Sequence, residues 1–163
     1  MFLQTEHNNL SLHQIRSFEE HQSGVNQILK LSEKKFVTCS DDCVLKFWNN
    51  NKPDFDISVE TITCIAKVAG DIVIAGCHSG NLLVVNTKSK AVSPIDQAHL
   101  NLVRGIVSLD YVFKGEYFIS ADVCGFIKVW RIVNKMPSLM QTIQMPGAIS
   151  YNSVIELSHF IKN

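Results

Sequence analysis

The strongest constraint on this chain is a pattern of two short apolar runs separated by a small polar turn, which occurs three times. The first copy reads FVTCSDDCVLKFW, from Phe36 to Trp48. The second copy lies within residues 71–88, and the third lies within residues 116–132 and includes Trp130. β-Branched and aromatic residues dominate these runs, and short polar turns typically join two strands into a hairpin. The sequence therefore predicts three β-hairpins.

The three copies recur at the spacing of a repeat protein. Their equivalent closing positions are Trp48, Val85 and Trp130, which lie 37 and 45 residues apart. A period of about 40–45 residues with four strands per repeat is typical of propeller blades. Each hairpin is preceded by a further apolar strand and followed by a more polar segment, which supplies the third and fourth strands.

The additional strands are expected at regular places along the chain. A weaker polar segment also stands before the first copy, so the order is one outer strand and then three inner strands. The first inner strands are expected in residues 24–31, 61–68 and 102–112, and the outer strands in residues 10–18, 54–60, 91–97 and 138–145. Residues 147–163 are interpreted as the first strand of a fourth blade.

The composition is that of a folded domain in a reducing compartment. Apolar residues make up 46% of the chain, and fifteen basic residues balance fifteen acidic ones, which gives no electrostatic footprint for nucleic acid or anionic lipid. The N-terminal sequence does not predict a signal peptide, and no stretch approaches the run of about 18 apolar residues that a membrane helix needs. An odd number of scattered cysteines indicates free thiols rather than a disulfide framework; they are Cys39, Cys43, Cys64, Cys77 and Cys124. We expect a cytoplasmic protein with no membrane or nucleic-acid partner.

These repeats resemble the WD40-repeat family. In that family a His before the first inner strand, a Ser or Thr in the second, an Asp in the hairpin turn and a Trp in the third are joined by hydrogen bonds. A buried indole N–H and a buried imidazole need such partners. The resemblance implies an all-β fold, a partial β-propeller of about three four-stranded antiparallel WD40-type blades plus the start of a fourth. A single WD40 region would cover residues 1–163, with approximate repeats at 10–50, 51–88 and 89–132 and an incomplete one at 133–163.

The first copy contains the full family set. His21 precedes the first inner strand, Thr38 lies in the second, Asp42 lies in the turn and Trp48 closes the third. Two flanking positions depart from the family pattern, because Asn49 replaces the usual Asp after the Trp and Glu20 replaces the usual Gly before the His. The resemblance implies that these four side chains fix the geometry of the blade.

The other two copies depart further from the family set. In the third copy His99, Ser120 and Trp130 are in register, but Cys124 stands where the turn Asp is expected, and Asp122 is a candidate to compensate. The second copy keeps only the pattern of two apolar runs around a polar turn. It has no preceding His, and its three later positions are Ala75, Ser79 and Val85.

The number of blades does not close a ring. Propellers have 4–8 blades and the WD40 type normally about seven, whereas this sequence predicts three and part of a fourth. An open arc exposes two apolar sheet faces. Three solutions are open: further blades in a longer polypeptide, self-association or pairing with another fragment, or an arc covered by a partner. The first is favoured because the sequence starts on an outer strand and breaks off in an inner one, although the initial Met argues for a chain that begins here.

No catalytic, cofactor-binding or metal-binding residue is predicted. The sequence has no phosphate-binding Gly-rich loop, nucleophile elbow or paired-His zinc motif. His21 and His99 fall at the family's structural His position, whereas His78 lies in a hairpin turn and has no such role. A zinc site would need Cys and His side chains to converge, and equivalent turns of different blades lie apart.

A surface for partners is the remaining expectation. The resemblance implies docking on the face that carries the hairpin turns and the loops before the first inner strands. Five residues map to that face, and two of them are apolar. They are Gln22, Asp41, His78, Leu100 and Val123. Packing of Leu100 and Val123 against adjacent loops is the alternative interpretation.

The functional hypothesis is a non-catalytic scaffold or adaptor segment that binds a protein or a peptide. The alternative is a substrate-recognition or targeting segment of a larger enzyme, such as a ubiquitin ligase or a kinase, whose catalytic module lies outside this chain. The isolated chain is expected to self-associate, because the end faces of an open arc are apolar.

Overall fold

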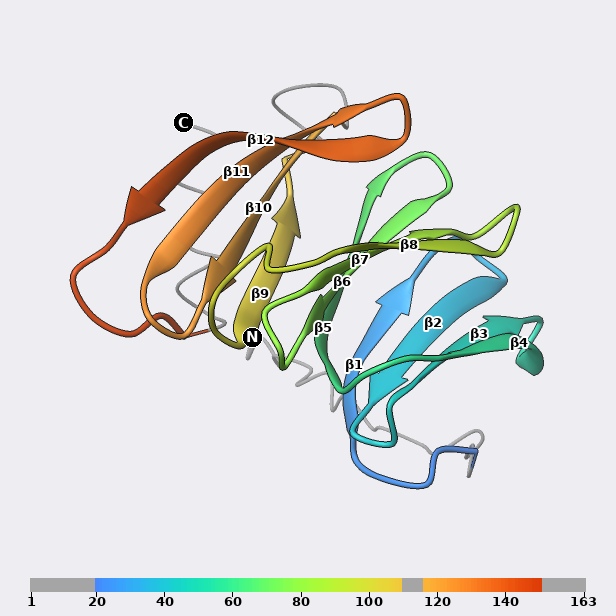
Figure 1. The fold of residues 1–163 in the computed structure, drawn as a ribbon. Helices are drawn as coiled ribbons and strands as arrows, with labels where there is room; N and C mark the ends of the chain where they lie inside the picture. Colours follow the sequence, from blue (N-terminus) through green and yellow to red (C-terminus); the bar gives the residue numbers. More distant parts are fainter. Residues whose placement is uncertain (1–19, 110–115, 151–163) are drawn as a thin grey trace, which may run out of the picture.

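The computed structural model describes residues 20–109 and 116–150, and all regular secondary structure in these ranges is β. Twelve strands form three four-stranded antiparallel sheets, which confirms the predicted fold class (Figure 1). The expected outer strand at 10–18 and most of the expected fourth blade lie outside the described residues.

Each sheet, here called a blade, is built from four consecutive strands that pair in chain order. Blade 1 contains β1 (Val25–Lys30), β2 (Lys35–Ser40), β3 (Val44–Asn49) and β4 (Lys52–Ser58). Blade 2 contains β5 (Ile62–Ala69), β6 (Ile72–Cys77), β7 (Leu82–Asn86) and β8 (Ala91–Ile95). Blade 3 contains β9 (Val103–Ser108), β10 (Tyr117–Asp122), β11 (Phe126–Val133) and β12 (Met136–Gln144). Each blade thus takes its outer strand from the polar segment that follows its three inner strands.

The turns between strands use residues that tolerate positive φ. The β3–β4 turn has Asn50 at φ 50° and Asn51 at φ 60°, and the β11–β12 turn has Asn134 at 52° and Lys135 at 67°. Positive φ at both central residues matches the right-handed twist of the strands that such a turn joins. These turns therefore bring β4 and β12 back along the outer edges of their sheets.

In two of the three blades a glycine occupies the same position in the turn between the second and third strands. Gly80 and Gly125 have φ of 93° and 92°, and the equivalent residue of blade 1 is Cys43 with φ 64°. A Cβ on Gly80 would lie 2.2 Å from the carbonyl oxygen of His99. Only glycine fits at this position, because the turn of blade 2 touches the loop that leads into blade 3.

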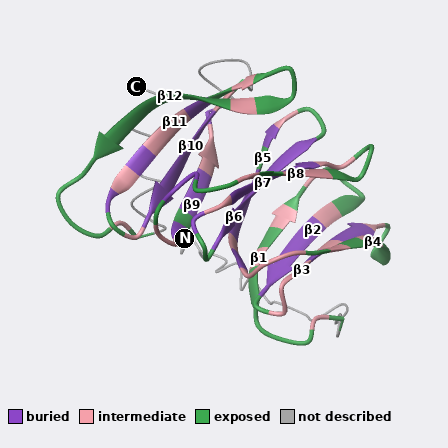
Figure 2. Cartoon of the chain, viewed as in Figure 1, coloured by how far each residue is buried: buried purple, intermediate pink, exposed green. Residues whose placement is uncertain are grey.

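The core consists mainly of two apolar layers between neighbouring blades. Blade 2 lies between blades 1 and 3 (Figures 1 and 2), and all six residues of β6 are buried. Val37 and Phe47 pack in the layer with blade 1, while Phe118 and Trp130 pack in the layer with blade 3. A strand buried on both faces has to be continuously apolar, which explains the sequence IVIAGC in β6.

A further apolar cluster lies in blade 3, where Leu109, Ile119, Ala121 and Ile127 are buried together. Alternation of side chains along a strand puts Ile119 and Ala121 on the opposite face of β10 from Phe118 and Ser120. This cluster therefore belongs to the face of blade 3 that points away from blade 2.

Candidate docking surface and the hydrogen-bond networks beneath it

In blade 1 the four side chains of the family set are joined by hydrogen bonds. His21 lies with Nε2 2.7 Å from Thr38 Oγ1 and Nδ1 2.7 Å from Asp42 Oδ2, and Trp48 Nε1 donates to Thr38 Oγ1 at 3.1 Å. One assignment of hydrogens satisfies all three contacts with a neutral imidazole. The indole donates to the Thr38 oxygen, the Thr38 hydroxyl donates to Nε2, and Nδ1–H donates to the carboxylate.

The Asp42 carboxylate also fixes the loop before β1. Its oxygens accept hydrogen bonds from the backbone N–H of Gln22 at 2.9 Å and of Val44 at 3.0 Å. Burial raises the pKa of Asp42, but the hydrogen bonds from Gln22 and His21 outweigh burial and hold this pKa below its ordinary value of 3.8. The carboxylate is therefore ionised at neutral pH, and it holds the backbone of an exposed loop residue in place.

Blade 3 contains a corresponding network that is more deeply buried. His99 Nε2 lies 2.7 Å from Ser120 Oγ, Trp130 Nε1 donates to Ser120 Oγ at 2.8 Å, and His99 Nδ1 lies 3.3 Å from Asp122 Oδ2. None of these four residues is more than 4% exposed. Burial lowers the pKa of His99 and nearby Lys128 adds to this effect, whereas the Asp122 carboxylate opposes it.

Asp122 accepts two backbone hydrogen bonds whose equivalents in blade 1 are accepted by Ser40 and Asp42. In blade 1 Ser40 Oγ accepts from the Asp42 N–H, and Asp42 Oδ1 accepts from the Val44 N–H. In blade 3 Asp122 Oδ1 accepts from the N–H groups of both Cys124, at 2.9 Å, and Phe126, at 3.0 Å. The carboxylate thus comes from the end of β10 instead of the turn, two positions earlier than in blade 1.

Blade 2 has no equivalent network among its strands. Ala75 and Val85 replace the hydroxyl and the indole, and both are 0% exposed. The turn uses Asn81 instead, whose side chain donates to Glu60 Oε1 at 2.9 Å and accepts from the backbone N–H of Gln97 at 2.9 Å. Asn81 therefore links the loops on either side of the blade at the same end of the sheet.

The five residues expected on the hairpin-turn face lie at or near the surface. Gln22, Asp41, His78 and Leu100 are exposed, and Val123 is half-buried. Asp41 is also a structural partner, because Asn26 donates to its carboxylate at 2.8 Å and to the Ile62 carbonyl at 2.9 Å. Leu100 is 82% exposed, so it does not pack against adjacent loops.

Leu100 borders a small pocket of about 160 Å³ on this face. Phe126, Lys128 and Thr142 line it with His99 and Asp122, and none of the first three was singled out by sequence analysis. A comparison of the third-strand lysines of blades 1 and 3 with the residues opposite them on the outer strands would have indicated this pocket. Lys46 in blade 1 pairs with Asp56 at 2.8 Å, but the residue opposite Lys128 is Thr142, and the Lys128 ammonium instead donates to the Ala98 carbonyl.

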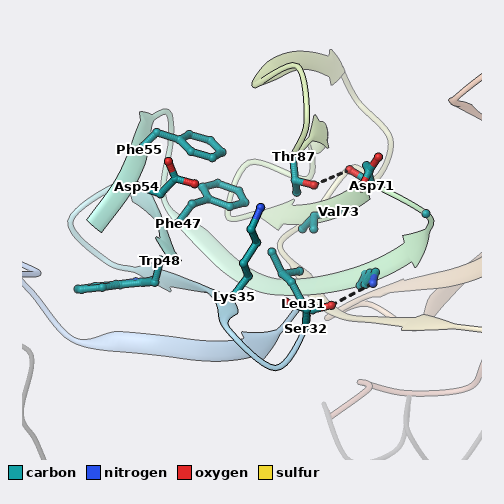
Figure 3. A pocket seen from close by; sticks show the side chains of 12 residues that line it. Leu31, Ser32, Lys35, Phe47, Trp48, Asp54, Phe55, Asp71, Val73 and Thr87 are labelled. Carbon is teal, nitrogen blue, oxygen red and sulfur yellow. Dashed lines mark hydrogen bonds between the residues drawn. The ribbon is translucent and has the colours of Figure 1, made fainter. Parts of the chain in front are cut away.

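A larger pocket of about 310 Å³ opens between blades 1 and 2 at the opposite end of the strands (Figure 3). Phe47 and Phe55 form one wall, stacked with ring centroids 4.2 Å apart. The Lys35 side chain extends along the pocket, and the Trp48 indole points away from it (Figure 3). Asp54 at the rim lies 3.7 Å from the Lys90 ammonium. This pocket has no signature in the sequence, because it forms where strands and turns of two blades meet.

The described residues give no geometry for metal binding. No group of three or more His, Cys, Asp and Glu side chains converges within residues 20–109 and 116–150. Cys39, Cys64 and Cys77 are buried and free. Burial raises the pKa of Cys39 to about 11 and of Cys64 to about 12, so both are protonated at neutral pH.

In the part of the chain that the structure describes, there is no helix of the length and hydropathy needed to span a membrane.

Comparison with known proteins supports the architecture. The family model for the WD domain, G-beta repeat, matches residues 12–49. The WD40 β-propeller domain of Doa1 has a similar structure with a TM-score of 0.65 and 25% identity, and the match covers 77% of this chain and 42% of that one. A chain of the mitotic checkpoint complex shares the fold with a TM-score of 0.73 and 14% identity, covering 85% of this chain and 45% of that one. The resemblance to WD40 repeats is therefore confirmed.

A curated relative in fission yeast (Schizosaccharomyces pombe) is also similar in sequence. The U3 small nucleolar RNA-associated protein 21 homolog is 26% identical over 112 residues, which cover 66% of this chain. The match spans only 11% of the relative's length. WD40 propeller domains are generally non-catalytic scaffolds that mediate protein–protein contacts.

Proposed function

We propose that this chain is a non-catalytic scaffold segment that binds a protein or peptide on its hairpin-turn face. The observation that carries the proposal is the rigid mounting of exposed loops on buried networks. The Asp42 carboxylate holds the backbone of exposed Gln22, and exposed Leu100 directly follows His99, which is anchored to Ser120 and Asp122. Loops that are already ordered lose little conformational entropy when a partner binds.

The chemistry of this face suits a partner with a small apolar anchor. Leu100 projects into solvent beside a pocket with an apolar wall from Phe126 and a cation from Lys128. Binding hot spots of protein partners are side chains that fill pockets, and a cavity of about 160 Å³ has room for one such side chain. A short peptide with an apolar side chain, and a carboxylate near it, fits this arrangement.

The partner class and the compartment follow from charge and thiols. The chain carries no net charge at pH 7, so the proposal does not include nucleic acid or an anionic membrane as a partner. Buried free cysteines favour a reducing intracellular compartment. The fission-yeast relative is named for a small nucleolar RNA, and this name does not favour the cytoplasm over the nucleus. The proposed compartment is therefore intracellular and reducing, without a choice between the two.

The alternative proposal is that the same face recruits substrates for a larger enzyme. Both proposals place binding on the hairpin-turn face, and they differ in whether a catalytic module is attached to the WD40 region. The experiment below tests the face itself, and the domain content of the full-length polypeptide separates the two roles.

A comparison of three baits tests the docking face. Leu100→Asp combined with Val123→Asp puts charge on the apolar part of the face, whereas Ser89→Asp puts a charge on an exposed turn at the opposite end of the strands. We expect partners retained from cell extract by the wild type and by Ser89→Asp to be lost from the double variant, with all three folded by circular dichroism. Equal retention by all three baits would exclude this face.

A further inference from the structure

Solvent-exposed large apolar side chains concentrate on the outer strand of blade 3 and at its two ends. Among the described residues, six of the nine such side chains lie between residues 133 and 145. Their exposed fractions range from 38% to 56%; they are Val133, Met136, Leu139, Met140, Ile143 and Met145. Strand β12 forms the outer edge of its sheet and is exposed along almost its whole length (Figure 2).

The outer strand of blade 1 offers a position-by-position comparison. Both outer strands have a bulge opposite the Trp that closes the third strand, so their registers correspond. Where β4 has Lys52, Asp54 and Asp56, β12 has Ser138, Met140 and Thr142. Charged residues on an edge strand, together with bulges, are the usual protection against pairing with another strand. β12 keeps the bulge and lacks the charges.

The outer strand of blade 2 is protected in a different way. β8 is only five residues long and contains Pro94, which has no N–H to donate to a new neighbour. β12 also contains a proline, Pro137, but only at its start; no charged residue occurs from Met136 to Met145, and every residue from Ser138 to Met145 has a backbone N–H. β12 is therefore the outer strand with the least protection among the three described blades.

We propose that β12 is a self-pairing edge, along which two copies of this chain join antiparallel into one continuous eight-stranded sheet. No strand of the described residues pairs with the outer side of β12. The partner that completes such an edge is an extended strand, and β12 itself is one. Two copies of an uncharged strand meet without short-range repulsion. The chain as a whole has a formal net charge of zero and a pI of about 7.0, so two copies also do not repel at long range.

This contact differs from ring closure and from the proposed docking function. It lies on the outer rim of blade 3, whereas ring closure would use the end faces of blades 1 and 3, and partner binding would use the hairpin-turn face. An antiparallel pair of identical strands is two-fold symmetric, so every favourable contact occurs twice. The dimer therefore leaves both hairpin-turn faces available.

Sedimentation equilibrium of the wild-type chain and a charge-transplant variant tests the proposal. The variant Met140→Asp, Thr142→Asp copies the two aspartates of β4, Asp54 and Asp56, onto β12 and changes the net charge by −2. Ser32→Asp combined with Asn51→Asp changes the net charge equally at two exposed turns of blade 1, which blade 2 separates from β12, and is the matched control. We expect the wild type and the control to dimerise with the same affinity, and the variant to dissociate at least about tenfold more readily, because like charges opposed across the two strands and carboxylates desolvated at the contact both weaken the pairing.

Hydrogen exchange on the wild type gives a second test that needs no variant. The alternate amides of residues 138–144 that point away from β11 should become more protected as protein concentration rises, while amides of β4 should not change. A wild type that remains monomeric, a dimer that survives the charge transplant, or concentration-dependent protection confined to β1 or β10 would overturn the proposal. Loss of partner binding in the Leu100 and Val123 variant has no bearing on it, so the two proposals fail independently.

Discussion

Blades 2 and 3 have the same four-stranded sheet but stabilise it with different chemistry. Blade 3 places His99, Ser120, Trp130 and Asp122 in a buried hydrogen-bond network, whereas blade 2 has Ala75 and Val85 at the corresponding hydroxyl and indole positions. Buried polar networks are often replaceable by well-packed apolar residues. The difference shows that apolar layers on both faces are sufficient for the blade shape, and that the network mainly holds the loops at one end of the sheet.

Of the variants that distinguish blades 2 and 3, truncation of the blade 3 indole should cause the largest loss of stability. We expect Trp130→Ala to lower the free energy of unfolding by about 3–5 kcal/mol, because a buried aromatic is lost and Ser120 loses a donor. Trp48→Ala in blade 1 should fall in the same range, and Val85→Ala in blade 2 should cost about 1–3 kcal/mol. Urea denaturation followed by circular dichroism measures all three, and equal losses would mean that the indole has no special role.

The turn of blade 2 should be the next most sensitive site. Gly80→Ala adds a Cβ 2.2 Å from the His99 carbonyl oxygen at a positive φ, which should cost about 2–4 kcal/mol. Cys43→Gly changes the equivalent residue of blade 1 to the glycine its φ favours, so we expect no loss of stability there. Thermal melts of both variants provide the measurement, and tolerance of alanine at position 80 would contradict the close contact between blades 2 and 3.

Removing the carboxylate of blade 3 should have a moderate effect. Asp122→Ala leaves the backbone N–H groups of Cys124 and Phe126 and the His99 ring without their acceptor, at an expected cost of about 1–3 kcal/mol. Asp42→Ala should behave similarly in blade 1. Ser79→Ala, at the turn of blade 2, removes only one exposed acceptor, which the Asn81 N–H reaches at 3.2 Å, and should cost less than about 1 kcal/mol. A loss as large at Ser79 as at Asp122 would remove the distinction between the two blades.

Acidification should produce the smallest effect, and it should come from blade 3. Burial lowers the pKa of His99 below its ordinary value of 6.5, so between these two values the unfolded chain binds more protons than the folded one. The stabilisation is complete above pH 6.5 and is lost as pH falls below it. Melting temperatures measured on both sides of pH 6.5 test this, and His99→Gln, which does not titrate, should flatten the dependence. An unchanged slope in that variant would assign the dependence to another group.

Most of the fold could be read from the sequence because it follows from local patterns. The hairpins ending at Trp48 and Trp130 have alternating β-branched and aromatic residues, and these produce strands wherever one face is buried. The outer strands were expected as polar segments, and their side chains are indeed mostly exposed or half-buried.

The site could be predicted less completely because it depends on register across strands and between blades. Asp122 was only a candidate, since its role depends on how the end of β10 meets the His99 loop. Phe126 and Lys128 were missed because their environment is set by Thr142, fourteen or more residues away in the chain. The pocket between Phe47 and the turns of blade 2 was missed for a similar reason, because it exists only where two blades meet.

The position of the outer strand in each sheet has a consequence for how such a chain can change in length. In the repeats expected from the sequence, each repeat begins with the strand that completes the preceding sheet, whereas each sheet contains four consecutive strands; the repeat and the sheet are then out of phase by one strand. Gain or loss of a whole repeat inside the array regenerates intact sheets on both sides. Fragmentation between repeats instead separates three strands from their fourth, so splicing or proteolysis at that boundary would leave one piece with an incomplete sheet.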